Sequence, residues 1–105
     1  MSRPPDHLTS ARVLFYTPLD SRHQPTGAAH HAVHGHELGP VAGLALCQYE
    51  ADPHVYIFYC SPDWQVITET CHHSLLDARK RAEAEYKGVG ATWSPHQDSH
   101  QKPRH

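Results

Sequence analysis

The sequence lacks both a long apolar run and a marked excess of either charge. Its longest strongly apolar stretch, residues 41–47, is far too short to cross a bilayer. Residues 1–10 contain no apolar segment of the kind that a secretory signal needs. The formal charge of −2 argues against a dedicated nucleic-acid or membrane binder. We therefore expect a cytoplasmic protein that binds neither nucleic acid nor membranes.

The sequence also lacks an even number of cysteines, and its three cysteines (Cys47, Cys60 and Cys71) do not have the spacing of a metal motif. A reduced, cytoplasmic chain is therefore favoured over a disulfide-stapled one. Histidine is abundant by contrast: protonating all 12 histidines would change the formal charge from −2 to +10. We expect solubility and association to respond to pH between about 5 and 7.5, where histidines titrate.

A β-hairpin is predicted for residues 55–70. Residues 55–60 are apolar and rich in β-branched and aromatic side chains, which is typical of a buried strand. Ser61-Pro62-Asp63 suits a type I turn, because proline fixes φ at the second position. The alternating side chains of residues 64–70 predict the returning strand.

A helix is predicted for residues 75–87. Ser74 is a suitable N-cap, with Asp77 three residues later in a variant of the capping box. Gly88 stands where a left-handed C-terminal cap is expected. One stripe of this helix is apolar, so we expect that face to pack on a sheet with the charged residues pointing outward. The stripe consists of Leu75, Ala78, Ala82, Tyr86 and Val89.

Two more strands are predicted at residues 12–17 and 41–49. Residues 18–40 between them carry turn formers and no sustained period, so we expect a long loop. Residues 1–10 and 94–105 are polar and show no apolar periodicity, and we expect both to be disordered.

Together these elements predict a single α+β domain over residues 11–93. Its fold would be a four-stranded antiparallel meander with one C-terminal helix packed on one face (β-β-β-β-α). The strand at residues 55–60 is apolar on both sides, whereas one helix, roughly 20 Å long, covers only one face. A second copy of the chain is the simplest cover for the other face, so we expect a homodimer. Four aromatic residues around the hairpin are the expected interface: Tyr49, Tyr56, Tyr59 and Trp64.

The strings YIFYCSPDW, VITET and AEAEYKGVGATW, with a His-Ser helix start, resemble a group of small bacterial proteins of uncharacterised function. That group has an aromatic strand ending in a Tyr-Cys turn, a strand that begins with Trp, and a helix closing in Gly and Trp. This chain has Glu69 and Cys71 where the group carries Asp and Trp. The resemblance covers residues 41–93 and implies a bacterial source and a helix-on-sheet fold, with no activity attached.

The densest group of candidate metal ligands is His30, His31, His34 and His36. Neutral imidazoles suit zinc, nickel or copper. Against a physiological site, this group lies in the predicted loop, has only Glu37 as an acidic neighbour, and has no cysteine nearby. Adventitious metal binding is therefore the more economical interpretation, and a zinc or nickel site is the alternative.

Cys71 precedes the predicted helix, where the helix dipole and the unpaired amides favour a thiolate. On an extended chain His73, rather than His72, would face this thiol. A thiol enzyme also needs an orienting group and an oxyanion pocket, and the sequence identifies neither.

The leading hypothesis is thus a small non-enzymatic protein without a cofactor, which acts as a homodimer through contacts with a protein partner. A metal-binding protein that uses the histidines of residues 30–36 is the alternative. A thiol enzyme that uses Cys71 with His73 is a weaker third hypothesis.

Overall fold

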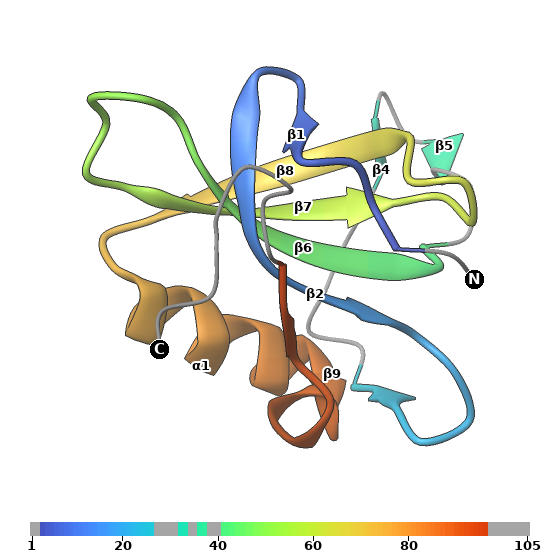
Figure 1. Ribbon diagram of the computed structural model, residues 1–105. Helices are drawn as coiled ribbons and strands as arrows, with labels where there is room; N and C mark the ends of the chain where they lie inside the picture. Colours follow the sequence, from blue (N-terminus) through green and yellow to red (C-terminus); the bar gives the residue numbers. More distant parts are fainter. Residues whose placement is uncertain (1–2, 27–31, 34–35, 38–40, 97–105) are drawn as a thin grey trace, which may run out of the picture.

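The computed structural model describes residues 3–26, 32–33, 36–37 and 41–96, with the backbone alone for 32–33 and 36–37. An antiparallel sheet packs against one helix, which confirms the α+β class (Figure 1). The sheet contains β1 (His7–Leu8), β2 (Ala11–Pro18), β6 (Gly43–Gln48), β7 (Val55–Cys60), β8 (Val66–His72) and β10 (Ser94–Pro95). The other elements are α1 (Leu75–Glu85), the 3-10 helix η1 (Val89–Ala91), and two strand pairs, β3 (Gln24–Pro25) with β9 (Tyr86–Lys87) and β4 (Ala32–Val33) with β5 (His36–Glu37). In this part of the chain no helix is long and apolar enough to span a membrane.

The four predicted strands are present as β2, β6, β7 and β8, which are neighbours in that order. The predicted total of four strands is wrong, because β1 and β10 both pair with the outer edge of β2. These two strands come from the segments 1–10 and 94–105, which we expected to be disordered. A strand of two residues has no periodicity, so the apolar pattern does not predict it. Residues 97–105 lie outside the described part of the chain.

The buried residue His96 connects these two segments through hydrogen bonds. The backbone N–H of His96 donates to the carbonyl oxygen of Leu14 at 2.9 Å, next to the pairing of β10 with β2. The side-chain Nε2 of His96 lies 2.9 Å from the carbonyl oxygen of Pro4 and donates to it, because a carbonyl oxygen only accepts. The His96 side chain is 1% exposed. Segments from both ends of the sequence therefore cover the same edge of the sheet.

The turn between β7 and β8 lies where the sequence predicts it, but the second strand begins later. The backbone N–H of Trp64 donates to the carbonyl oxygen of Ser61 at 2.9 Å, as in a β-turn. Trp64 has a φ of 65°, in the left-handed region, and its side chain is buried. Strand β8 therefore begins at Val66 and not at Trp64.

Helix α1 begins as predicted and ends two residues early. The Ser74 side chain accepts a hydrogen bond from the backbone N–H of Asp77 at 3.1 Å and caps the first turn. The helix ends at Glu85 because the next two residues form β9 with β3. Part of the predicted loop at residues 18–40 is thus attached to the end of the helix.

Gly88 has the predicted left-handed backbone, with a φ of 106°. A Cβ atom at this position would lie 2.6 Å from the backbone carbonyl oxygen of Arg22, so both conformation and space demand glycine. The carboxylate of Glu83 accepts hydrogen bonds from the backbone N–H groups of Gly88 and Gly90, at 3.0 and 2.8 Å. These two bonds lower the pKa of Glu83 and fix the chain after the helix.

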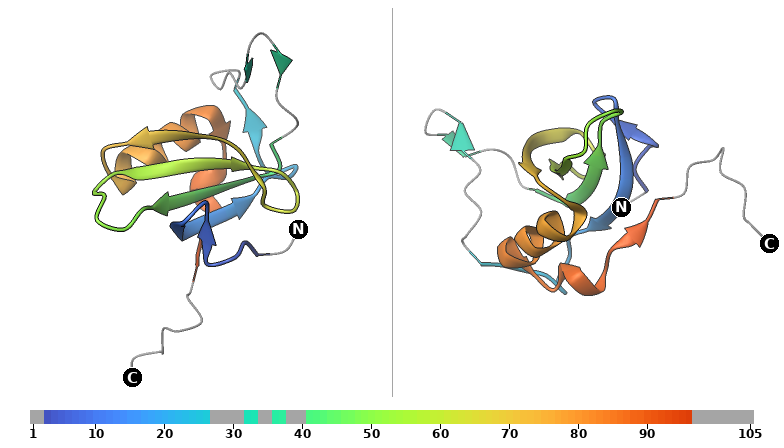
Figure 2. Two further views of the ribbon diagram at one scale, coloured as in Figure 1. Left: turned by 90° about the horizontal axis from the view of Figure 1, so that it is seen from above. Right: turned by 90° about the vertical axis from the view of Figure 1, so that its left-hand side faces the viewer.

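The apolar core has two parts, one on each face of a curled sheet (Figure 2). The helix-side cluster comprises Leu44, Leu46, Val55, Ile57, Tyr59, Ala78, Ala82, Tyr86 and Val89. The opposite cluster comprises Leu8, Ala11, Val13, Ala45, Cys47, Phe58, Cys60 and Trp64. Both faces of β7 are thus buried within a single chain.

Because one chain covers both faces of its own sheet, no bare face needs a second copy of the chain to cover it. Leu8 from β1 and Trp64 from the β7–β8 turn pack over the second face. Among the described residues, the exposed large apolar side chain is Leu76, at 61%. A single apolar side chain on a surface is ordinary and does not require a partner. If the chain forms a homodimer, the cause is therefore something other than exposed apolar surface.

One charged residue of the helix points inward, contrary to the prediction. Glu85 is only 3% exposed, and its carboxylate accepts hydrogen bonds from the Tyr59 hydroxyl at 2.5 Å and from Nε of Arg81 at 2.7 Å. Arg81 thereby compensates a buried negative charge, which would be costly if left unpaired. Burial and the hydrogen bond to Glu85 raise the pKa of Tyr59 well above its usual value.

Replacing Ala82 by leucine is expected to destabilise the fold. Ala82 is fully buried between the helix and the sheet, so the larger side chain overpacks the contact and costs about 1–3 kcal/mol. Urea unfolding followed by circular dichroism measures this change in the free energy of unfolding. Ala84→Leu is the matched control, because Ala84 is exposed on the same helix. Equal effects of the two substitutions would contradict the assigned buried face.

Candidate functional site

The predicted metal ligands fall outside the described side chains. His30, His31 and His34 are not described at all, and His36 is described by its backbone alone, in β5. Among the described residues, no three His, Cys, Asp or Glu side chains already converge on one point. A zinc or nickel site at residues 30–36 stays a prediction.

The four predicted interface aromatics do not form one surface. Tyr59 is buried on the helix side of the sheet, whereas Trp64 is buried on the opposite side. Tyr49 and Tyr56 lie half-buried on the Trp64 side, with their rings edge to face and 5.1 Å apart. Tyr59 and Trp64 thus belong to the core of the chain itself, and an interface that includes Tyr49 and Tyr56 stays a prediction.

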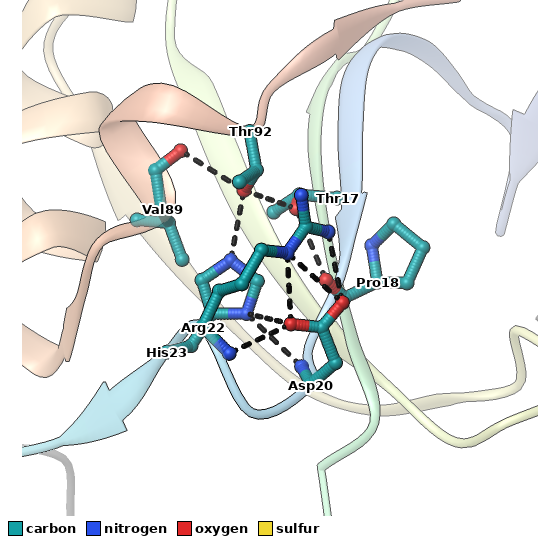
Figure 3. Close-up of polar contacts among 7 residues, drawn as sticks. All are labelled: Thr17, Pro18, Asp20, Arg22, His23, Val89 and Thr92. Carbon is teal, nitrogen blue, oxygen red and sulfur yellow. Dashed lines mark hydrogen bonds and ion pairs between the residues drawn. The ribbon is translucent and has the colours of Figure 1, made fainter.

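A buried polar network joins the loop after β2 to η1 (Figure 3). Nδ1 of His23 accepts the backbone N–H of Asp20 at 3.0 Å, so the ring proton lies on Nε2, which donates to Oγ1 of Thr92 at 2.8 Å. The Thr92 hydroxyl also lies 2.7 Å from Oγ1 of Thr17. Both nitrogens of the buried ring have a partner within the chain. The network thus explains how the loop is held and leaves no group directed at a ligand.

The three cysteines differ in accessibility. Cys47 and Cys60 are fully buried, and burial raises the pKa of both thiols, that of Cys60 to about 12. Cys71 is exposed on β8. Thiol chemistry in the described part of the chain is therefore confined to Cys71.

Cys71 lies within a group of polar side chains on β7, β8 and the residues next to them. We call Asp52, His54, Tyr56, Cys71 and His73 the β7–β8 polar cluster. The strand register pairs Tyr56 with Cys71, and the two side chains lie next to each other. The neighbouring Cys71 side chain and the hydrogen bond from the Tyr56 hydroxyl to Oδ2 of Asp52 at 3.0 Å raise the pKa of Tyr56.

Asp52 also fixes the imidazole of His54. Oδ1 of Asp52 accepts the backbone N–H of His54 at 2.9 Å and lies 2.8 Å from Nδ1 of the same residue. An ionised carboxylate only accepts hydrogen bonds, so Nδ1 of His54 carries a proton, and in the neutral ring Nε2 keeps its lone pair. These hydrogen bonds from His54 lower the pKa of Asp52.

The predicted pairing of Cys71 with His73 is not formed as a hydrogen bond. Within the described residues, the Cys71 thiol lies beside the Tyr56 hydroxyl, and no hydrogen bond joins it to an imidazole. The ring of His73 instead lies beside that of His54, with 5.8 Å between the ring centres. The arrangement shows two neighbouring imidazoles and an exposed thiol, without the imidazole contact that activates a cysteine nucleophile.

An open groove lies between the β1–β2 turn and the β6–β7 turn. Its volume is about 680 Å³, and charges of both signs line it. Arg12 contributes the positive charge, Glu50 and Asp52 contribute the negative charges, and His7 and Gln48 add polar groups. Left-handed backbone at Thr9, Ser10 and Ala51 shapes the two turns around it. The groove is wide and chemically mixed, and it does not indicate one class of ligand.

The two edges of the sheet differ. The outer edge of β2 is occupied by β1 and β10. Strand β8 pairs only with β7 among the described residues, so its other edge is open along seven residues. An open edge presents unpaired N–H and C=O groups to any strand that approaches it.

In comparisons with protein-family models, with curated proteins and with solved structures, nothing matches this chain. The site must therefore be interpreted from its own geometry.

Two residues of the polar cluster, Asp52 and His54, were not among the predicted site residues. An Asp-Pro-His sequence between two strands was the available signal, because aspartate commonly accepts the backbone N–H two residues later. The open edge of β8 follows from strand order and has no signature in the sequence of β8 itself.

Replacing Asp52 by asparagine is expected to change how stability depends on pH. The folded-state pKa of Asp52 lies below its unfolded value of about 3.9, so the carboxylate stabilises the fold above that pH and loses this effect as the pH falls. The stability difference between wild type and Asp52→Asn should shrink as the pH falls from about 5 to about 2. Urea unfolding at several pH values measures it. A difference that does not vary over this range would contradict the Asp52–His54 interaction.

Proposed function

We propose that the chain is a non-enzymatic binding protein that works as a homodimer, in which the β8 strands of two copies pair along their open edges. The observation that carries this proposal is the asymmetry between the two sheet edges. Segments from both ends of the sequence cover the edge of β2, whereas no described segment covers that of β8.

The composition of β8 supports edge pairing. Its sequence, VITETCH, starts with β-branched residues and contains neither proline nor lysine, two residues with which proteins commonly protect an edge strand. Antiparallel pairing of two β8 strands about a two-fold axis would continue the sheet and satisfy the outward backbone groups of both.

The same strand also carries one feature that opposes pairing. Glu69 lies near the middle of β8 and is exposed. Antiparallel pairing of two copies brings their Glu69 carboxylates into one small region, where like charges repel. Glu69 therefore limits the affinity, and its neutralisation should strengthen the dimer.

A non-enzymatic role agrees with the state of the candidate nucleophile. In the described part of the chain, the Cys71 thiol lies beside Tyr56 and makes no hydrogen bond to an imidazole. The resemblance over residues 41–93 to small bacterial proteins brings no activity with it. The second partner that such a dimer would bind is a protein in this proposal, since the formal charge of −2 does not favour nucleic acid.

Two substitutions on β8 should shift the dimer in opposite directions. Ile67→Glu adds a second carboxylate beside Glu69 in each copy, and we expect at least about tenfold weaker dimerisation. Glu69→Gln removes the repulsion and should tighten the dimer. Sedimentation equilibrium at neutral pH measures both dissociation constants.

Leu76→Glu is the matched control for Ile67→Glu. It makes the same kind of change at an exposed apolar position on α1, away from the β8 edge, and should leave dimerisation unchanged. A wild-type chain that stays monomeric at millimolar concentration would refute the proposal. Equal weakening by Leu76→Glu and Ile67→Glu would show that dimers form through another surface.

A further inference from the structure

The β7–β8 polar cluster contains two imidazoles and a thiol, side chains that commonly bind metal ions and that pairing along the β8 edge does not need. Strand register places Tyr56 opposite Cys71 and Val55 opposite His72. Because side chains alternate along a strand, His54 and His73 fall on the same face as Tyr56 and Cys71. Two imidazoles and one thiol therefore gather on one face, at one end of the β7–β8 pair.

His54 is oriented in the way that metal-binding histidines usually are. Its Nδ1–H is directed at the Asp52 carboxylate at 2.8 Å, which leaves the Nε2 lone pair available. A carboxylate behind a histidine fixes the tautomer and makes the imidazole a better ligand. The Tyr56 hydroxyl donates a hydrogen bond to Oδ2 of Asp52 at 3.0 Å, which further restrains the orientation of this carboxylate.

His73 lies at a suitable separation from His54. Two imidazoles that bind one zinc ion through nitrogens at about 2.1 Å have ring centres roughly 5 Å apart. The observed separation of the two ring centres is 5.8 Å. The His73 side chain is exposed, so a small rotation about its own side-chain bonds closes this difference.

Cys71 is exposed on β8, and His73 follows two residues later, just past the end of the strand. The Cys71 thiol lies beside Tyr56, and the described side chains do not place three ligands around one point. Rotation about the Cα–Cβ bond of Cys71 would bring its thiol toward the imidazoles, so the site would form when an ion binds.

We propose that His54, His73 and Cys71 bind one zinc-type divalent metal ion, with Asp52 positioning His54. Two imidazoles and a thiolate form a donor set that selects zinc-class ions over calcium or magnesium, which prefer oxygen ligands. Water completes the four-coordinate shell. This site is separate from the histidines of residues 30–36 and does not depend on dimerisation through β8.

Cobalt(II) is the probe, because a thiolate bound to cobalt gives a charge-transfer absorption that imidazoles alone do not give. Titration of the reduced, full-length protein should produce this absorption, and added zinc should abolish it. Cys71→Ser should remove the absorption, while His54→Ala and His73→Ala should each weaken cobalt binding at least tenfold. Asp52→Asn should weaken binding by about 10–100-fold, as expected for a residue that positions a ligand.

Two controls separate this site from other histidines. His72→Ala should leave the absorption and affinity unchanged, because His72 lies on the opposite face, where its Nε2 contacts the hydroxyl of Thr70 at 2.8 Å. A variant with His30, His31, His34 and His36 all changed to alanine should keep the thiolate absorption. Absence of this absorption in wild type, or its loss in the alanine variant, would overturn the proposal. Circular dichroism of each variant confirms that the fold is retained.

Discussion

The need to bury both faces of β7 governs the rest of the fold. Four consecutive residues of this strand, Ile57, Phe58, Tyr59 and Cys60, are fully buried, so apolar groups must cover the sheet on both sides. Helix α1 covers one side, and residues from β1, β2 and the β7–β8 turn cover the other. At about 25 cal/mol per Å² of apolar surface, this two-sided burial is the main stabilising term of a small domain. It also uses segments from both ends of the sequence, which pair with the edge of β2, whereas no segment that the structure describes pairs with the outer edge of β8.

Buried polar groups then make this packing specific. Glu85 is held between Tyr59 and Arg81, and His23 bridges the backbone of Asp20 and the hydroxyl of Thr92. Such groups are costly when unpaired, so each restricts the chain to the arrangement that satisfies it. The β7–β8 polar cluster differs from these networks because His54, Cys71 and His73 keep exposed surface. That difference is why we assign ligand chemistry to the cluster and a structural role to the buried networks.

Short-range patterns in the sequence predict those elements whose conformation depends mainly on residues close by in the sequence. The strand at 55–60, the Ser74 cap and the left-handed Gly88 each follow from short-range chemistry, and all are present. The strands β1 and β10 could not be predicted, because two-residue strands exist only through pairing with β2. The cover of the second face was missed for the same reason, and an uncovered face was inferred in its place. Of the candidate site, Cys71 and His73 could be identified from the sequence, and the Asp-Pro-His sequence was a local signal for Asp52 and His54, but only the structure shows that the His54 and His73 rings are neighbours.

In the part that the structure describes, one chain buries both faces of its sheet and leaves the outer edge of β8 without a paired strand. Amide hydrogen exchange resolved by residue, at low and at high protein concentration, tests both features together. We predict that β7 amides are protected at both concentrations, because β6 and β8 pair with them in every copy. Alternate amides of β8 should exchange rapidly in dilute protein and slowly in concentrated protein, when a second β8 pairs with them. Protection of all β8 amides in dilute protein would contradict the open edge, and rapid exchange at both concentrations would contradict pairing between two copies.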